Sequence, residues 1–205
     1  KDADAMTLTL SNVGVFVGVG GGLTDVGSDG DYSNDTVANG TLGFGATVST
    51  LTLVSIKDRG LTTATTDDRT YLGVALDNFK GDLVGLDSLL AFHAYDVDAV
   101  LNKAAHGDGT TVVPKLSWAT FTSTGLDISA AKTALNATSL GNLTNSVDLA
   151  VDGGVALNVL DGVLVAKGDF TIALGQVKSE ALPSGVTKDA DAMTLTLSNV
   201  GVFVG

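Results

Sequence analysis

The sequence has no cysteine, so neither disulfide bonds nor thiolate metal sites can hold the fold together. Proline occurs only twice, and Arg59 and Arg69 are the only arginines. With a net charge of −12 there is no basic face for a phosphate backbone, so nucleic acid is not an expected partner. No apolar run approaches the roughly 18 residues of a membrane helix. We therefore expect no transmembrane segment.

Strand-forming and turn-forming residues dominate what is present. All but one of the 23 acidic residues are aspartates, and there are 26 glycines and many threonines. Aspartate and glycine favour turns, and threonine favours strands, whereas good helix formers such as Glu and Met are scarce. Because 44% of the residues are hydrophobic, the chain has much surface to bury. The composition predicts an all-β protein.

The first eighteen residues occur twice. Lys1–Gly18 reads KDADAMTLTLSNVGVFVG, and Lys188–Gly205 repeats these letters without a substitution. We interpret this as a tandem array with a period of 187 residues, in which 1–187 is one full repeat unit and 188–205 begins the next identical unit. A segment duplicated at one end is the alternative. The expected seam between units is 181–191.

Alternation of apolar and polar residues predicts long antiparallel strands. In 7–19 the alternation shifts phase at Ser11-Asn12, which indicates a bulge or bend within one strand. Turns are expected at Asp77-Asn78, at 80–82, at 152–154, at Asp161-Gly162 and at 167–169. The further strands expected are 41–56, 71–76, 112–121, 147–151, 155–160, 163–166 and 170–174.

Three other segments have less regular patterns. Residues 82–105 fit a helical period in part, but we interpret them mostly as strands because Leu90, Phe92 and Ala94 alternate. Residues 127–137 predict a short helix, with Asp127 or Ser129 as its N-cap. Residues 20–40 form a polar loop whose Asn39-Gly40 end is a hairpin signal.

Together these patterns predict an elongated tubular barrel or β-solenoid-like repeat, continuous between tandem units. Leu, Val, Ile and Phe are expected inside, and Thr, Asp, Ser and Gly outside. Closing the sheet and adding the next unit would cover apolar strand edges, which otherwise invite aggregation.

The site residues that the sequence offers are few. Asp25, Asp29, Asp31 and Asp35 lie in an oxygen-rich loop suited to calcium, although their spacing matches neither the EF-hand nor the β-roll nonapeptide, and a solvated acidic loop is the alternative. Asp67-Asp68 is a second, weaker cluster. His93 and His106 lack the motif partners of nucleophilic catalysis. We expect structural or surface roles for both histidines and no enzyme activity.

The texture of LTLSNVGVFVGVGGGL, GTLGFGATVSTLTLVSIKD, YLGVALDNFKGDLVGL and VALNVLDGVLVAKGDFTIAL resembles the long tandem repeats of giant bacterial extracellular or surface proteins, adhesin-like and associated with hemolysin-type calcium-binding modules. The resemblance carries no catalytic residues. It implies an extracellular or cell-surface location.

Two functions follow as expectations. The first is a structural repeat that serves as a stiff shaft or spacer, with neighbouring repeats or identical chains as partners. The second is an adhesin-type module in which residues 20–40 or 127–145 contact a glycan or surface, either with or without calcium. A polysaccharide lyase would need more Arg and His than the chain has.

Overall fold

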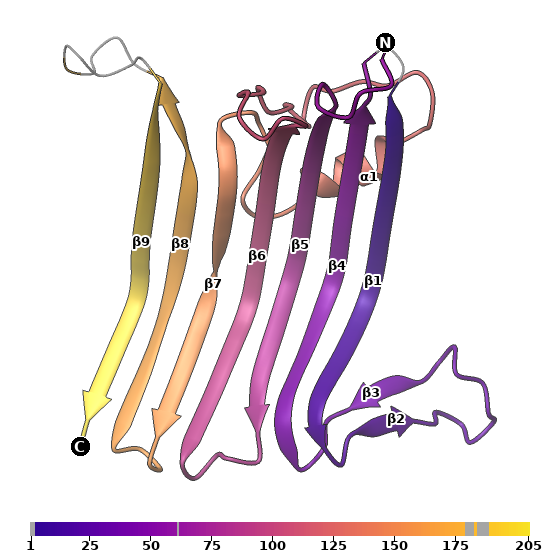
Figure 1. Ribbon diagram of the computed structural model, residues 1–205. Helices are drawn as coiled ribbons and strands as arrows, with labels where there is room; N and C mark the ends of the chain where they lie inside the picture. Colours follow the sequence, from indigo (N-terminus) through magenta and orange to yellow (C-terminus); the bar gives the residue numbers. More distant parts are fainter. Residues whose placement is uncertain (1–2, 61, 179–182, 184–188) are drawn as a thin grey trace.

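The fold is one antiparallel sheet with a single layer of strands (Figure 1). The computed structural model describes residues 3–60, 62–178, 183 and 189–205. Seven strands lie in the order β1-β4-β5-β6-β7-β8-β9. Their bounds are Asp4–Val19 (β1), Leu42–Asp58 (β4), Arg69–Val84 (β5), Leu90–His106 (β6), Val147–Val159 (β7), Leu164–Lys178 (β8) and Asp189–Val204 (β9).

Two smaller elements complete the described structure. The strands β2 (Gly22–Thr24) and β3 (Thr36–Ala38) form a hairpin beside the end of β1, within the segment expected to be a loop. The helix α1 (Ser129–Leu135) confirms the predicted short helix. Its N-cap is Ile128 rather than Asp127 or Ser129, although an Asp127 carboxylate oxygen accepts a hydrogen bond from the Ser129 N–H.

The all-β antiparallel prediction is confirmed, but closure is not seen within the described residues. The sheet is open, with β1 at one edge and β9 at the other. Among the described residues β1 pairs with β4 and β9 with β8, no pairing joins β1 to β9, and these two strands lie at opposite sides of the sheet in Figure 1. A closed tube or solenoid is therefore not formed by one unit. Most of the expected seam, 181–191, and the boundary at 187 and 188 lie outside the described residues.

Several predicted turns are instead bends within continuous strands. The bend predicted at Asn12 is confirmed, since its φ is 53°. Asn78 and Asp96 have φ values of 50° and 51° at matching places in β5 and β6, and β7 runs unbroken through 152–154, as β8 does through 167–169. Asn, Asp and Gly tolerate the positive φ of a bulge as readily as that of a turn. Figure 1 shows the strands bending together along this line.

The bends keep aliphatic side chains on one face along the whole strand length. β8 contains no positive φ, so its alternate residues from Leu164 to Leu174 share a face. Both Ile172 and Ala166 on this face pair with β9, the first with Leu195 and the second with Val202. Leu195 and Val202 differ in sequence parity and share a face only because of the bulge at Asn199 between them.

The buried core lies on the opposite face, beneath α1, which is behind the strands in Figure 1. Sheet residues Val54, Ile56 and Val100 pack there against Trp118 and Leu135. The prediction that the alternating aliphatic residues form the packed interior is thus wrong for the described unit. No described segment packs on its aliphatic face as a second layer, because the long connection 107–146 covers the other face.

A buried polar network holds this covering segment in place. The Asn102 side-chain amide donates to the carbonyls of Leu116 (2.8 Å) and Thr144 (2.9 Å). Its oxygen accepts the Trp118 indole N–H at 3.0 Å. Trp118 has no exposed surface, and its backbone N–H bonds the Leu143 carbonyl. Residues 112–121, predicted to be a strand, are irregular because these contacts fix them outside the sheet.

We predict that Gly73→Ala loosens the packing of Trp118. A Cβ at Gly73 would lie 2.7 Å from the indole ring, so the ring must move. We expect a loss of about 1–3 kcal/mol in unfolding free energy and a red shift of the single tryptophan's fluorescence. Gly125→Ala is the control, because a Cβ at Gly125 meets no atom within 4 Å. Equal stability of the two variants would contradict the close packing at Gly73.

Candidate assembly interface

The two copies of the repeated segment form the two edges of the sheet. β1 begins at Asp4 and ends at Val19, one residue past the repeated sequence, and β9 begins at Asp189 and ends at Val204, one residue before the end of its copy. Their backbones share the same bend, since φ is 53° at Asn12 and 52° at its counterpart Asn199. The same letters have therefore folded into the same strand in two different positions.

Each copy bonds the sheet through a different side of its backbone. The Thr41 N–H, at the start of β4, donates to the Val19 carbonyl at 2.8 Å. Neighbouring residues of a strand direct their N–H and C=O groups to opposite sides. Because the Val19 carbonyl points towards β4, the N–H and C=O groups of Gly18 point away from β4. Its counterpart Gly205 donates its N–H to Val163, at the start of β8, at 3.0 Å. One such strand can therefore bond β8 on one side and β4 on the other at the same time.

Side chains reinforce the contact between β8 and β9. The Asn199 amide donates to one Asp169 carboxylate oxygen at 2.6 Å, and the Tyr95 hydroxyl donates to the other at 2.9 Å. The Lys167 ammonium lies 5.4 Å from the centre of the Tyr95 ring. We call Tyr95, Lys167, Asp169 and Asn199 the seam cluster. The hydrogen bond from Asn199, then that from Tyr95, lowers the pKa of Asp169.

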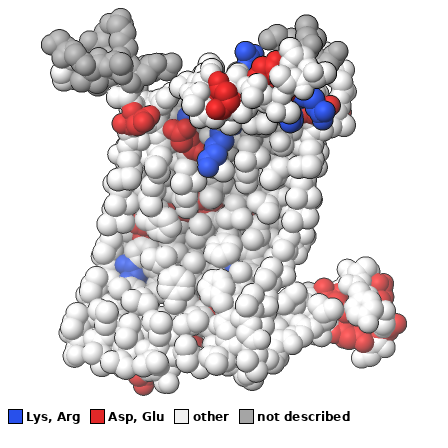
Figure 2. Space-filling model, viewed as in Figure 1, with Lys and Arg blue, Asp and Glu red and all other residues white. Residues whose placement is uncertain are grey.

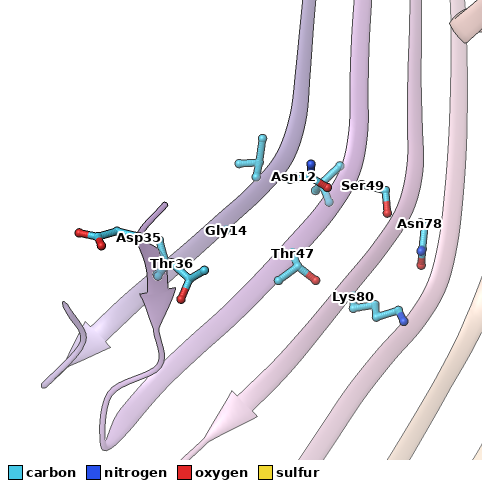
Figure 3. Close-up of a pocket in the computed structure, with 11 residues that line it drawn as sticks. Asn12, Gly14, Asp35, Thr36, Thr47, Ser49, Asn78 and Lys80 are labelled. Atoms are coloured by element: carbon cyan, nitrogen blue, oxygen red, sulfur yellow. The ribbon is translucent and has the colours of Figure 1, made fainter. Parts of the chain in front are cut away.

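At the other edge, Asn12 lines a shallow pocket of about 420 Å³ between the strands and the hairpin (Figure 3). Polar side chains from β4 and β5, among them Thr47, Ser49 and Lys80, form its floor. Asp35 and Thr36 line it from the hairpin side. Asn12 is exposed, whereas Asn199 is bonded to Asp169.

The predicted calcium residues lie together in the tip of the hairpin but bind backbone amides of their own loop. Oδ1 oxygens of Asp25, Asp29 and Asp31 accept the N–H groups of Asp29, Asp31 and Ser33, and Asp35 accepts that of Val26. In the described part of the chain no three His, Cys, Asp or Glu side chains converge as a metal site would require. The same holds around Asp67 and Asp68, the second acidic cluster. Calcium binding stays a prediction.

The two histidines each have an aspartate partner that sequence reasoning missed. His93 Nδ1 lies 2.5 Å from Asp82, on the neighbouring strand, and His106 Nδ1 lies 3.2 Å from Asp108. Strand register alone places His93 opposite Asp82. The Asp82 side chain is about half exposed, and His106 lines a pocket with Tyr71 and Thr111. Both contacts suit a structural role.

Comparisons with protein-family models, with curated proteins and with solved structures find no match. Among the described residues, no helix has the length and apolar character needed to cross a membrane.

We predict that the seam cluster makes stability depend on acidity. The folded-state pKa of Asp169 lies below its ordinary value of 3.8, so the ionised carboxylate stabilises the fold. This contribution is complete above that pH and disappears as the pH falls through the lower folded-state value. In urea titrations, native chain should exceed Asp169→Asn in stability at pH 6, and the difference should shrink towards pH 2. A difference independent of pH would contradict the assignment.

We also predict that one substitution has different effects in the two copies. Glycine keeps the positive φ of Asn12 and Asn199 but removes the side chain. Asn199→Gly loses the hydrogen bond to Asp169 and should lower the unfolding free energy by about 1 kcal/mol relative to Asn12→Gly. Because both variants lie in the same local sequence, each corrects the other for local effects. Equal losses in denaturant titrations would show that Asn199 contributes nothing to the seam.

Proposed function

We propose that this chain is a structural repeat of a bacterial extracellular fibre or giant surface protein, and acts as a stiff shaft or spacer. The observation that carries the proposal is the position of the repeated strand. Its two copies lie at opposite edges of one sheet and use opposite sides of the backbone for pairing. In an array, one strand would close the unit before it and open the unit after it.

Such sharing leaves six large strands for each repeat, because β9 of one unit is β1 of the next. At about 4.8 Å per strand, each unit would extend the sheet by about 29 Å. The backbone hydrogen bonds would lie along the direction of growth. Only the two outermost edges of the assembly would stay unpaired, so few strand edges would be available for uncontrolled aggregation.

The finer architecture is also part of the proposal. A continuous sheet of this kind can curl until its aliphatic face is enclosed, which would give the tubular form expected from the sequence. Two features support it: β9, which belongs to the second copy of the repeat, pairs with β8 of the first unit, and one face is aliphatic except at one end of the strands.

A second candidate is an adhesin-type binding module for a glycan or surface, with calcium as a cofactor. The observation in its favour is the hairpin, which projects beyond the sheet edge and carries a cluster of acidic side chains (Figure 2). Calcium-dependent binding by the native chain, lost when Asp25 and Asp31 become asparagine, would favour this candidate.

The test of the first proposal compares the 205-residue chain with tandem chains that have two and three units before the closing strand. We expect small-angle X-ray scattering to show one continuous particle that lengthens by about 29 Å per unit if the sheet stays extended. Asn→Gly at the internal seam should destabilise the tandem chain, and the same change in the first strand should not. Units that tumble as separate beads would contradict strand sharing.

A further inference from the structure

The aliphatic face of the sheet is not covered by any described segment. By the strand register, equivalent rows run from Leu10 in β1 through Leu51, Leu76 and Ala99 to Val151 in β7, and similar rows lie above and below. Its outermost side chains are well exposed, with 57% of Leu195 and 38% of Val155 accessible. Strand pairing at the edges cannot cover this face, because the backbone hydrogen bonds of such pairing lie in the plane of the sheet and the side chains of the face point out of that plane.

Charged side chains are confined to one end of this face. The register places Lys57, Lys103 and Asp191 there, next to the loops. The view in Figure 2 shows most charges gathered at the upper ends of the strands and on the hairpin, with a broad area over the middle and lower strands in which few charged atoms are visible. A surface without charge can bury itself against an identical surface without desolvating an ion.

The centre of the face is also level. The register puts Phe44, Phe79 and Gly81 on it. A Cβ at Gly81 would lie 2.7 Å from the Phe44 ring and 3.0 Å from the Phe79 ring, so both rings lie over the glycine and fill its hollow. A level aliphatic sheet is the surface that packs against another sheet about 10 Å away.

The aromatic residues argue against lipid as the occupant. Sheets that face lipid carry Trp and Tyr where they meet the headgroups. Here Trp118 lies under α1, Tyr95 spreads over Gly154 on the other face, and Tyr71 packs against the core on that same face. Tyr32 lies in the hairpin loop. None of the chain's Trp or Tyr side chains is on the aliphatic face.

We propose that this face docks on the aliphatic face of a second copy of the chain, to give two sheets packed face to face. The face measures about 34 by 50 Å, from seven strands of about sixteen residues, or about 1,700 Å². That is about twice the 800 Å² per partner of a stable interface. The contact buries the aliphatic face between two sheets, in place of the curling of one sheet on itself, and it does not depend on strand sharing.

The experiment uses the 205-residue chain and two double variants with the same added charge. Val155→Glu with Leu195→Glu places two carboxylates on the aliphatic face. Thr171→Glu with Thr196→Glu places them at exposed positions of the opposite face. Sedimentation velocity should show a dimer or larger species for the native chain and the threonine variant, and at least a tenfold weaker association for the aliphatic-face variant. Trp118 fluorescence, from beneath α1, reports whether each variant folds.

Three outcomes would overturn the inference. The first is a native chain that stays monomeric at 100 µM protein, about the concentration at which weak dimers form. The second is equal association of both double variants, and the third is that the native chain floats with phosphatidylcholine vesicles whereas the aliphatic-face variant does not. The last would assign the face to lipid. The length gained per unit in tandem chains reports strand sharing separately, so a failure of the proposed function and a failure of face-to-face docking are distinguishable.

Discussion

Backbone hydrogen bonding at the edge of the sheet is the constraint on which the rest of the structure depends. A strand of sixteen residues at a sheet edge presents a row of unpaired N–H and C=O groups, and here the edge strand is also aliphatic. Natural sheets protect such edges with charge, proline or covering loops. Along β1 the charge is limited to Asp4, and the strand contains no proline. In the proposed array its protection would be the neighbouring unit, because the two copies of the strand bond different partners, β4 and β8, through opposite sides.

The two faces of the sheet have different requirements. One face carries threonine, glycine and buried Asn102. A segment of about forty residues that includes α1 covers this face, where Trp118 and Leu135 bury its apolar residues and the Trp118 indole N–H donates to Asn102. The other face is aliphatic and has no segment of the described chain against it. Burial therefore remains incomplete in the described unit, and the interior expected from the sequence would need the further sheets of the proposed assembly.

The sequence predicted strands well and their interruptions poorly. The alternation at Leu8, Leu10 and Val13 shows a phase shift without a turn, so the bend at Asn12 was predictable. At Asn78 and Gly153 the same residue types predict turns, since positive φ serves a turn and a bulge alike. Gly168 also predicts a turn, yet it lies within the continuous strand β8 without a positive φ. The bonds from Asn199 and Tyr95 to Asp169 join residues 30 and 74 positions apart, and only strand register brings them together.

The shared line of bends has a consequence for any larger object built from these strands. Every strand turns at the same height, so successive units would align their bends into one uninterrupted crease running lengthwise. Since the strand that closes one unit always opens the next, such a filament would be directional, with one end unlike the other. A continuous crease of this kind would increase the resistance of a single-layered sheet to bending across its long axis.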